Sequence, residues 1–184
     1  MKIALIILLV IIVLIALYFI STYNTLVSLR NKVKDGWSQI DVVLKNRNDL
    51  IPNIVETVKG YAKHEKDTLD AVIEARSRAV SATTHEDEIK ASGEVTKALG
   101  RLFALAENYP ELKANTNFLD LQNKLNEIEE KIRFARQFYN DSVLTYKNKI
   151  EMFPSNIVAN MFNFKPEAFF EATLEERQNV QVKF

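Results

Sequence analysis

The stretch FLDLQNKLNEIEEKIRFARQFYNDSVLTYKNKI, residues 118–150, carries one continuous apolar seam. The members of the seam alternate spacings of three and four: Phe118, Leu121, Leu125, Ile128, Ile132, Ala135, Tyr139, Ser142, Tyr146 and Ile150. This spacing places them along one side of an α-helix, where they pack against partner helices. Glu127 with Lys131 adds a favourable pair on the solvated side. We therefore expect one long helix here and an all-α fold.

The N-terminus contains eighteen consecutive apolar residues, Ile3 to Ile20, with no charge among them. As a helix this run is about 27 Å long, close to the ~30 Å hydrocarbon core of a bilayer. We expect a transmembrane anchor over residues 1–22. A cleaved secretory signal is the alternative. It is less favoured because its apolar core is usually about 7–15 residues long and because no small-x-small cleavage site follows the run.

The charges that flank this run bear on its orientation. Arg30, Lys32 and Lys34 follow it, whereas only Lys2 precedes it. The count weakly favours a cytoplasmic position for the rest of the chain. The sequence therefore predicts a single-pass protein of the plasma (inner) membrane, although a signal anchor held by Lys2 could place the domain outside.

Composition excludes several classes of function. The chain has 184 residues, 24 Lys and Arg against 24 Asp and Glu, and no cysteine. A neutral chain without a basic stripe is a poor nucleic-acid binder, because that affinity comes largely from neutralising phosphates. The absence of cysteine excludes disulfides, thiol catalysis and thiolate metal sites.

A first amphipathic helix is expected directly after the apolar run. Leu26, Val33 and Ile40 recur at sevens, with a second row four residues later that includes Trp37. No proline or glycine separates Ile20 from Asp35, so the anchor is expected to continue into this helix. Gly36 costs about 1 kcal/mol relative to alanine inside a helix, which suggests close backbone packing or a small bend beside Trp37.

A second helix is expected from DLIPNIVETVKGYAKHE, residues 49–65. The preceding NRND favours a turn, Asp49 can cap the new helix, and Pro52 fits its first turn because that turn leaves amide hydrogens unpaired anyway. Tyr61 belongs to the stripe expected to pack. This helix is predicted to end near Ala79.

A third helix is expected to start at Thr84, which forms a capping pair with Asp87, and to end near Asn108. Together with residues 118–150, these segments predict an antiparallel bundle of about four helices over residues 23–153.

The segment MFPSNIVANMFNFKPEAFF, residues 152–170, differs from the rest by its density of aromatic residues. We treat residues 154–184 as an aromatic C-terminal segment that ends in a loosely held polar tail, residues 172–184. Such aromatic residues either plug one end of the bundle or form a docking surface for a partner or the bilayer. The candidate surface consists of Phe162, Phe164, Phe169 and Phe170.

A search for catalytic and metal-binding patterns finds none that is specific. His64 and His85 are the two histidines, and Thr68 stands where a zinc helix of the His-Glu-x-x-His type needs its second histidine. The four glycines do not form a phosphate-binding cluster. We therefore expect no catalytic residue, no cofactor and no metal.

Six blocks of the sequence resemble the LemA family of bacterial membrane proteins. They are YNTLVSLRNKV, WSQIDVVLK, DLIPNIVETVKGYAKHE, ENYPELKANTNFLDLQ, ARQFYNDSV and FPSNIVA, in order from Tyr23 to Ala159. The family motifs include Trp37, Asp49, Pro52 and Tyr61. Gly36 departs from the pattern, because the family more often has alanine there. The resemblance implies one N-terminal anchor and a long helical bundle, with suggested links to membrane remodelling and membrane metalloproteases.

Three functions remain open on these grounds. The leading hypothesis is a membrane-anchored scaffold or adaptor whose partners are the lipid bilayer, other membrane proteins such as a membrane metalloprotease, or a second copy of the chain, and not nucleic acid. A sensor stalk is the second, and it usually needs a second span. An enzyme is the third, and no recognisable constellation of residues supports it.

Overall fold

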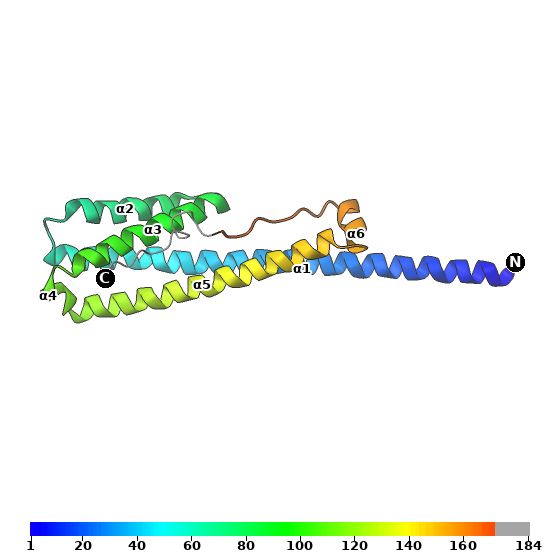
Figure 1. The fold of residues 1–184 in the computed structure, drawn as a ribbon, viewed down its shortest axis with the longest axis horizontal. Helices are drawn as coiled ribbons and strands as arrows, with labels where there is room; N and C mark the ends of the chain where they lie inside the picture. The colour runs from blue at the N-terminus through cyan, green and yellow to red at the C-terminus, as the bar shows by residue number, and fades with distance from the viewer. Residues whose placement is uncertain (172–184) are drawn as a thin grey trace, which may run out of the picture. The chain divides into compact units, whose positions relative to one another are not determined.

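The computed structural model describes residues 1–171, and throughout this range the regular structure is helical, without a strand. The helices are α1 Lys2–Tyr61, α2 Lys66–Ser81, α3 His85–Ala106, α4 Pro110–Lys113, α5 Thr116–Glu151 and α6 Ser155–Met161 (Figure 1). The all-α prediction is confirmed, and the four long helices match the number expected. The polar tail, residues 172–184, lies outside the described residues.

The expected start of the second helix at Asp49 is wrong. Helix α1 continues without interruption to Tyr61, so that Asp49 and Pro52 lie in its interior. The chain leaves the helix only between Tyr61 and Lys66, where α2 begins. Packing explains the difference: Arg47 and Asn48, which belong to the predicted turn, are buried, and burial of this kind overrides weak local preferences.

The other two predicted helices are confirmed. Thr84 is the N-cap of α3, and its Oγ1 accepts a hydrogen bond of 3.2 Å from the backbone N–H of Asp87. Helix α5 covers the whole seam of residues 118–150, and Phe118, Ile132 and Tyr146 of that seam are among the most deeply buried side chains.

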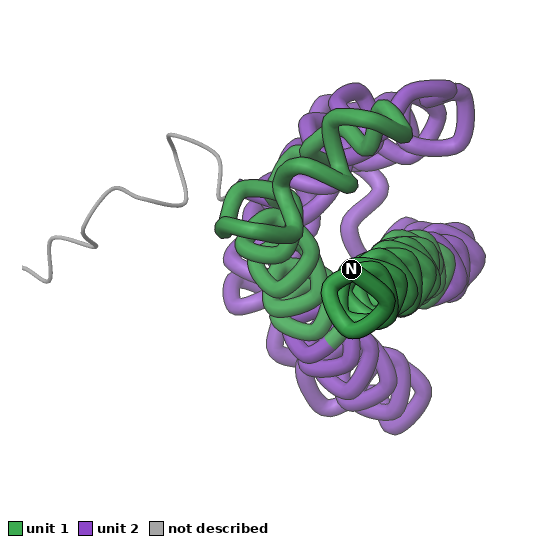
Figure 2. Tube along the Cα trace, turned by 90° about the vertical axis from the view of Figure 1, so that its right-hand side faces the viewer, with its two compact units in different colours: residues 1–39, 135–169 green, residues 40–134, 170–184 purple. Residues whose placement is uncertain are grey.

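The described chain divides into two compact units (Figure 2). Residues 1–39 and 135–169 form unit 1, and residues 40–134 with Phe170 and Glu171 form unit 2. The core of unit 2 is contributed by the C-terminal part of α1, by α2, α3 and α4, and by the start of α5. Within this unit α2 and α3 lie side by side and are linked at the surface by Arg78 and Glu94.

Unit 1 is built on an antiparallel pair formed by the N-terminal part of α1 and the C-terminal part of α5. A Cβ atom added to Gly36 would lie 3.2 Å from the Cα of Tyr139, so the two backbones approach closely here, as the glycine suggested. The rings of Trp37 and Tyr139 meet edge to face with centroids 5.2 Å apart. Arg30, which precedes Gly36 by six residues on α1, acts through its charge on Tyr146, which follows Tyr139 by seven residues on α5. Residue numbers along α5 therefore increase where those along α1 decrease, so the two helices run antiparallel.

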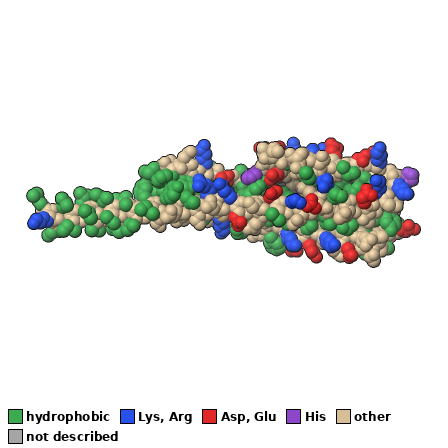
Figure 3. All heavy atoms as spheres, turned by 180° about the vertical axis from the view of Figure 1, so that it is seen from behind, with side chains coloured by type: hydrophobic (Ala, Val, Ile, Leu, Met, Phe, Trp, Pro, Cys, Tyr) green, Lys and Arg blue, Asp and Glu red, His purple; other side chains and the backbone are tan. Residues whose placement is uncertain are grey.

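The first part of α1 is exposed along its whole apolar run. Among the described residues, α1 is the one helix long and apolar enough to cross a membrane, and none of its most apolar stretch is buried in the protein. Hydrophobic side chains cover this slender part of unit 1 in Figure 3. An exposed apolar cylinder of this length is stable in lipid and costly in water. The structure therefore indicates a membrane location.

Candidate functional site

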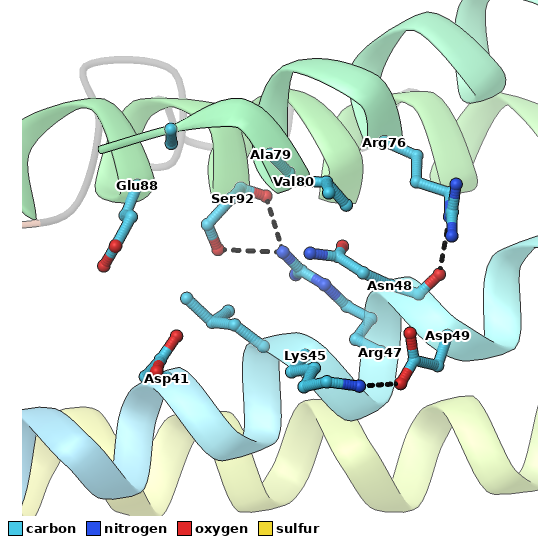
Figure 4. Close-up of a pocket in the computed structure, with 12 residues that line it drawn as sticks. Asp41, Lys45, Arg47, Asn48, Asp49, Arg76, Ala79, Val80, Glu88 and Ser92 are labelled. Carbon is cyan, nitrogen blue, oxygen red and sulfur yellow. Dashed lines mark hydrogen bonds and ion pairs between the residues drawn. The ribbon is translucent and has the colours of Figure 1, made fainter. Parts of the chain in front are cut away.

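The first candidate site is a pocket of about 250 Å³ in unit 2, between α1, α2 and α3 (Figure 4). Its lining residues carry both signs of charge: Asp41, Lys45, Arg47, Asp49, Arg76 and Glu88, beside the polar Asn48 and Ser92 and the apolar Leu44, Ala79, Val80 and Ala82. What this pocket can do depends on whether its charged groups are available to a ligand.

Arg47 is the most deeply buried charge of the pocket, with a side chain that is 0% exposed. Its guanidinium donates to Oγ of Ser92 at 3.0 Å and to Oγ1 of Thr96 at 3.0 Å, both on α3. It also forms an ion pair of 3.2 Å with Glu129 on α5. A buried charge is tolerated only when it is paired and hydrogen-bonded, and here the partners come from two other helices. Arg47 therefore fixes α1 against α3 and α5.

Arg76 on α2 performs a second structural task in the same pocket. Its Nε donates a hydrogen bond of 2.8 Å to the backbone carbonyl oxygen of Asn48. In a regular helix that carbonyl would accept from the N–H of residue 52, but Pro52 has none. Figure 4 shows Arg76 reaching down from α2 to this carbonyl. The contact explains how α1 passes through Pro52.

Two tyrosines are tied to polar groups away from the pocket. The hydroxyl of Tyr109 donates to Glu65 at 2.9 Å, and this hydrogen bond, followed by burial, raises the pKa of Tyr109. Tyr61 is 40% exposed rather than packed, and its hydroxyl accepts a bond of 2.9 Å from Asn115. Asp49 is also exposed and pairs with Lys45 one turn earlier. Among residues 1–171, no three His, Cys, Asp or Glu side chains lie close enough together to hold a metal ion.

The second candidate site lies in unit 1, where α6 ends. The N–H of Phe164 bonds the carbonyl of Ala159 at 2.9 Å, and the N–H of Asn163 bonds the carbonyl of Asn160 at 3.2 Å. Asn163 has φ 54°, the left-handed conformation that asparagine tolerates. These features form a Schellman motif, which reverses the chain after the helix. The reversal directs Phe164 into the unit.

The aromatic rings at this end of unit 1 gather around α1 just beyond the apolar run. The Tyr23 ring lies 4.7 Å from that of Phe162 and 5.8 Å from that of Phe164, measured between centroids. The guanidinium of Arg30 lies 5.1 Å from the centre of the Phe164 ring, a cation–π contact. The aromatic segment is thus attached to the same helix that carries the apolar run.

The four phenylalanines of the predicted surface do not share one environment. Phe164 and Phe170 are buried, and Phe169 is half-buried beside the ammonium group of Lys147. Phe162 remains 50% exposed despite its contact with Tyr23. Two of the rings therefore fit the plug interpretation, and the docking surface stays a prediction that concerns mainly Phe162.

The aliphatic side chains of the same segment were not among the residues predicted from the sequence to form a surface. Met152, Ile157 and Met161 are 60%, 47% and 62% exposed, and Phe153 is 81% exposed. Met152 and Phe153 stand between the end of α5 and the start of α6, whereas Ile157 and Met161 are four residues apart and so lie on one face of α6. That spacing was the signal in the sequence. We call Met152, Phe153, Ile157, Met161 and Phe162 the apolar patch.

An exposed apolar segment at the start of α1 and a helical bundle held together by buried polar contacts define a class of protein, namely a membrane-associated helical bundle. The chain belongs to the LemA family, whose sequence pattern matches residues 36–184. It is 25% identical over 163 residues to "Protein LemA" of Metamycoplasma hominis, which covers 88% of this chain and 74% of that protein. It is 27% identical over 194 residues to "Magnetosome protein MamQ 2" of Paramagnetospirillum magneticum, covering 89% of this chain and 71% of the relative.

Proposed function

We propose that this member of the LemA family is a non-enzymatic scaffold or adaptor, anchored in the membrane by residues 1–22. The observation that carries the proposal is the use of the buried polar groups of unit 2. Arg47 bonds Ser92, Thr96 and Glu129, and Arg76 bonds Asn48, so these groups hold helices together. A bundle stiffened in this way presents fixed surfaces to other proteins.

The proposal places the partner on the outer face of α2. Ile73 and Val80 are 51% and 62% exposed and lie seven residues apart, on the same side of that helix. Other membrane proteins, including a membrane metalloprotease, and a second copy of this chain are the partners that the proposal admits. A cytoplasmic position of unit 2 is part of the proposal, because it follows from Arg30, Lys32 and Lys34.

Photo-crosslinking in intact membranes tests the scaffold. A crosslinking amino acid at Ile73 is compared with one at Val42, which lies on α1 in unit 2 and is 60% exposed. We expect a defined protein to crosslink from Ile73 and not from Val42, and we expect the product to disappear in a Val80→Glu background whose melting temperature is unchanged. Equal labelling from both positions would contradict the proposed surface. Turnover of a small substrate by the purified full chain would contradict a non-enzymatic role.

A further inference from the structure

The apolar patch lies in the same unit as the span, at the point where the span ends. Tyr23 is three residues beyond Ile20, which is about 4.5 Å along a helix. The ring of Phe162 lies 4.7 Å from that of Tyr23. The antiparallel register of α1 and α5 brings the end of α5, where Met152 and Phe153 follow, to about the same height as Tyr23. The patch is therefore level with the border of the hydrocarbon core.

The patch is unusually apolar for a surface in contact with water. Phe153 exposes 81% of its surface, more than Ile3, which exposes 75% at the start of the apolar run. Large exposed apolar groups gathered in one place mark an interaction surface. Figure 3 shows hydrophobic side chains continuing from the N-terminal part of α1 onto the α6 end of the same unit. Lipid surrounds the apolar run in a membrane, and the apolar patch adjoins the surface of that run.

The charge of unit 1 suits the surface of an anionic membrane. Residues 1–39 and 135–169 contain eight Lys and Arg against four Asp and Glu, although the whole chain is neutral. Lys147, Lys149 and Lys165 flank the segment that carries the patch. Aromatic residues at the headgroup level with basic residues around them are typical of protein segments that lie in a membrane interface.

From this geometry we infer that the apolar patch is a second membrane contact, which inserts into the boundary between headgroups and acyl chains of an anionic bilayer beside the anchor. Phe164 and Arg30 hold the segment on α1, and Phe153, Ile157 and Met161 enter the lipid. The contact would fix the tilt and rotation of α1 at the membrane surface. The inference rests on the membrane anchorage contained in the proposed function.

Spin-label accessibility tests the contact, and the chain is suited to it because it has no cysteine of its own. Single cysteines replace Met161, Val80 and Val10 in the full chain, which is reconstituted at one copy per nanodisc of phosphatidylcholine and phosphatidylglycerol. Met161 and Val80 are both 62% exposed, so they form a matched pair in units 1 and 2. Val10 reports on the span. Each label is measured for its collisions with oxygen, which is enriched in lipid, and with a water-soluble nickel complex.

We expect the labels at Met161 and Val10 to collide more with oxygen than with nickel, and the label at Val80 to show the reverse. A Met161 label that behaves like the Val80 label, while Val10 stays in lipid, would overturn the second contact and leave the anchor intact. A Met161 label shielded from both reagents would overturn it in favour of a protein partner. A Val10 label open to nickel would overturn the anchor itself and the proposed function with it.

Two further measurements control for loss of stability in the labelled variant and for lipid charge. If Met161→Cys lowers the melting temperature, Phe153→Cys takes its place, because that side chain is the most exposed of the patch and its replacement disturbs little packing. In nanodiscs of phosphatidylcholine alone, the Met161 label should shift toward water. An unchanged position there would overturn the preference for anionic lipid.

Discussion

The Nε atom of Arg76 lies 2.8 Å from the carbonyl oxygen of Asn48, the one carbonyl in this turn of α1 that Pro52 deprives of its helical partner. A proline in a helix interior costs about 3 kcal/mol, partly because it orphans that carbonyl. Asn48 is buried, so water is a poor substitute for the missing N–H. Arg76 supplies the missing donor from α2. The side chain of Arg76 and the proline at position 52 should therefore affect stability jointly, through the carbonyl of Asn48.

The first prediction is that Arg76 and Pro52 are energetically coupled. Arg76→Met should lower the free energy of unfolding by about 1–3 kcal/mol, because it leaves a buried acceptor unpaired. In a Pro52→Ala background the restored N–H of residue 52 can take over, and the same change should cost much less. Denaturation of the four detergent-solubilised proteins gives the coupling as a double-mutant cycle.

Arg78 provides the control for this cycle, since it lies on the same helix and pairs with Glu74 and Glu94 at the surface. Arg78→Met should cost less than about 1 kcal/mol in either background, because exposed ion pairs contribute little. Equal costs of Arg76→Met in both backgrounds would contradict the coupling.

The contact between Arg76 and Asn48 explains why the start of the second helix was predicted wrongly from the sequence. Thr84, the apolar run and the seam of residues 118–150 are recognised from neighbours within one or two turns, and the helical structure predicted from each of them is confirmed. Pro52 looks like a helix start by the same local rules. What keeps it inside α1 is a donor 28 residues from Asn48, and no local pattern predicts that partner.

The second prediction concerns the close approach of α1 and α5 at Gly36. A Cβ at this position would lie 3.2 Å from the backbone of Tyr139, whereas a Cβ at Gly100 in α3 would meet nothing within 4 Å. Gly100→Ala should therefore raise stability by about 0.5–1 kcal/mol through helix propensity. Gly36→Val should lower it by about 1–3 kcal/mol through overpacking.

Melting temperatures of the two valine variants separate propensity from packing, because valine has the same intrinsic preference at both positions. Gly100→Val is the matched control for Gly36→Val. If the two variants melt together, the backbones have room at Gly36 and the close contact does not constrain the pair.

The third prediction is that Glu129 stabilises the fold only because Arg47 is present. Glu129→Ala removes the carboxylate from a guanidinium that is 0% exposed, and should cost about 2–4 kcal/mol. In an Arg47→Met background there is no buried charge left to compensate, so the same change should cost less than about 1 kcal/mol. Glu130, which pairs with Arg133 at the surface, is the control, and its loss should be near neutral in both backgrounds.

The aromatic segment shows the same limit of sequence reasoning at the candidate site. Its composition alone marked it as unusual, and the rings at 162, 164, 169 and 170 look equivalent in the sequence. They differ in the structure because Asn163 turns the chain at φ 54° and sends Phe164 inward while Phe162 stays outside. A single backbone angle decided which ring is available, and asparagine only hints at that angle.

The fourth prediction tests the anchor. The full chain should remain in the membrane pellet after alkaline carbonate washing, because the apolar run is exposed in the protein and stable only in lipid. Replacing Leu9 and Ile12 together with arginine should shift the protein toward the supernatant, since each arginine at the centre of a span costs about 2.5–3.5 kcal/mol. Val42→Arg, on the exposed surface of unit 2, should leave it in the pellet.

The fifth prediction compares two buried tyrosines seven residues apart on α5. Tyr139 is 3% exposed, and its hydroxyl donates a hydrogen bond of 2.8 Å to the carbonyl of Ala168. Tyr146 is 0% exposed, and its hydroxyl has no hydrogen-bond partner among residues 1–171. Tyr139→Phe should therefore cost about 0.5–1.5 kcal/mol, whereas Tyr146→Phe should be neutral or stabilising. A loss of stability in Tyr146→Phe equal to that in Tyr139→Phe would show that its hydroxyl is bonded after all.

The fifth prediction extends to pH dependence, because the same pair of tyrosines should make the protein sensitive to alkali. Burial is the main cause that raises the pKa of both Tyr139 and Tyr146; at Tyr146 the charge of Arg30 partly opposes this increase, and at both tyrosines the charge of Glu167 adds to it. Because the folded pKa lies above the unfolded value of about 10, the unfolded chain gives up its phenolic proton first. The stabilisation is thus complete below about pH 10 and is lost as the pH rises through the folded pKa. When melting temperatures are measured from about pH 8 upward, they should fall less steeply above about pH 10 for Tyr146→Phe than for the wild-type protein, because the variant has one fewer buried phenol whose pKa is raised by folding.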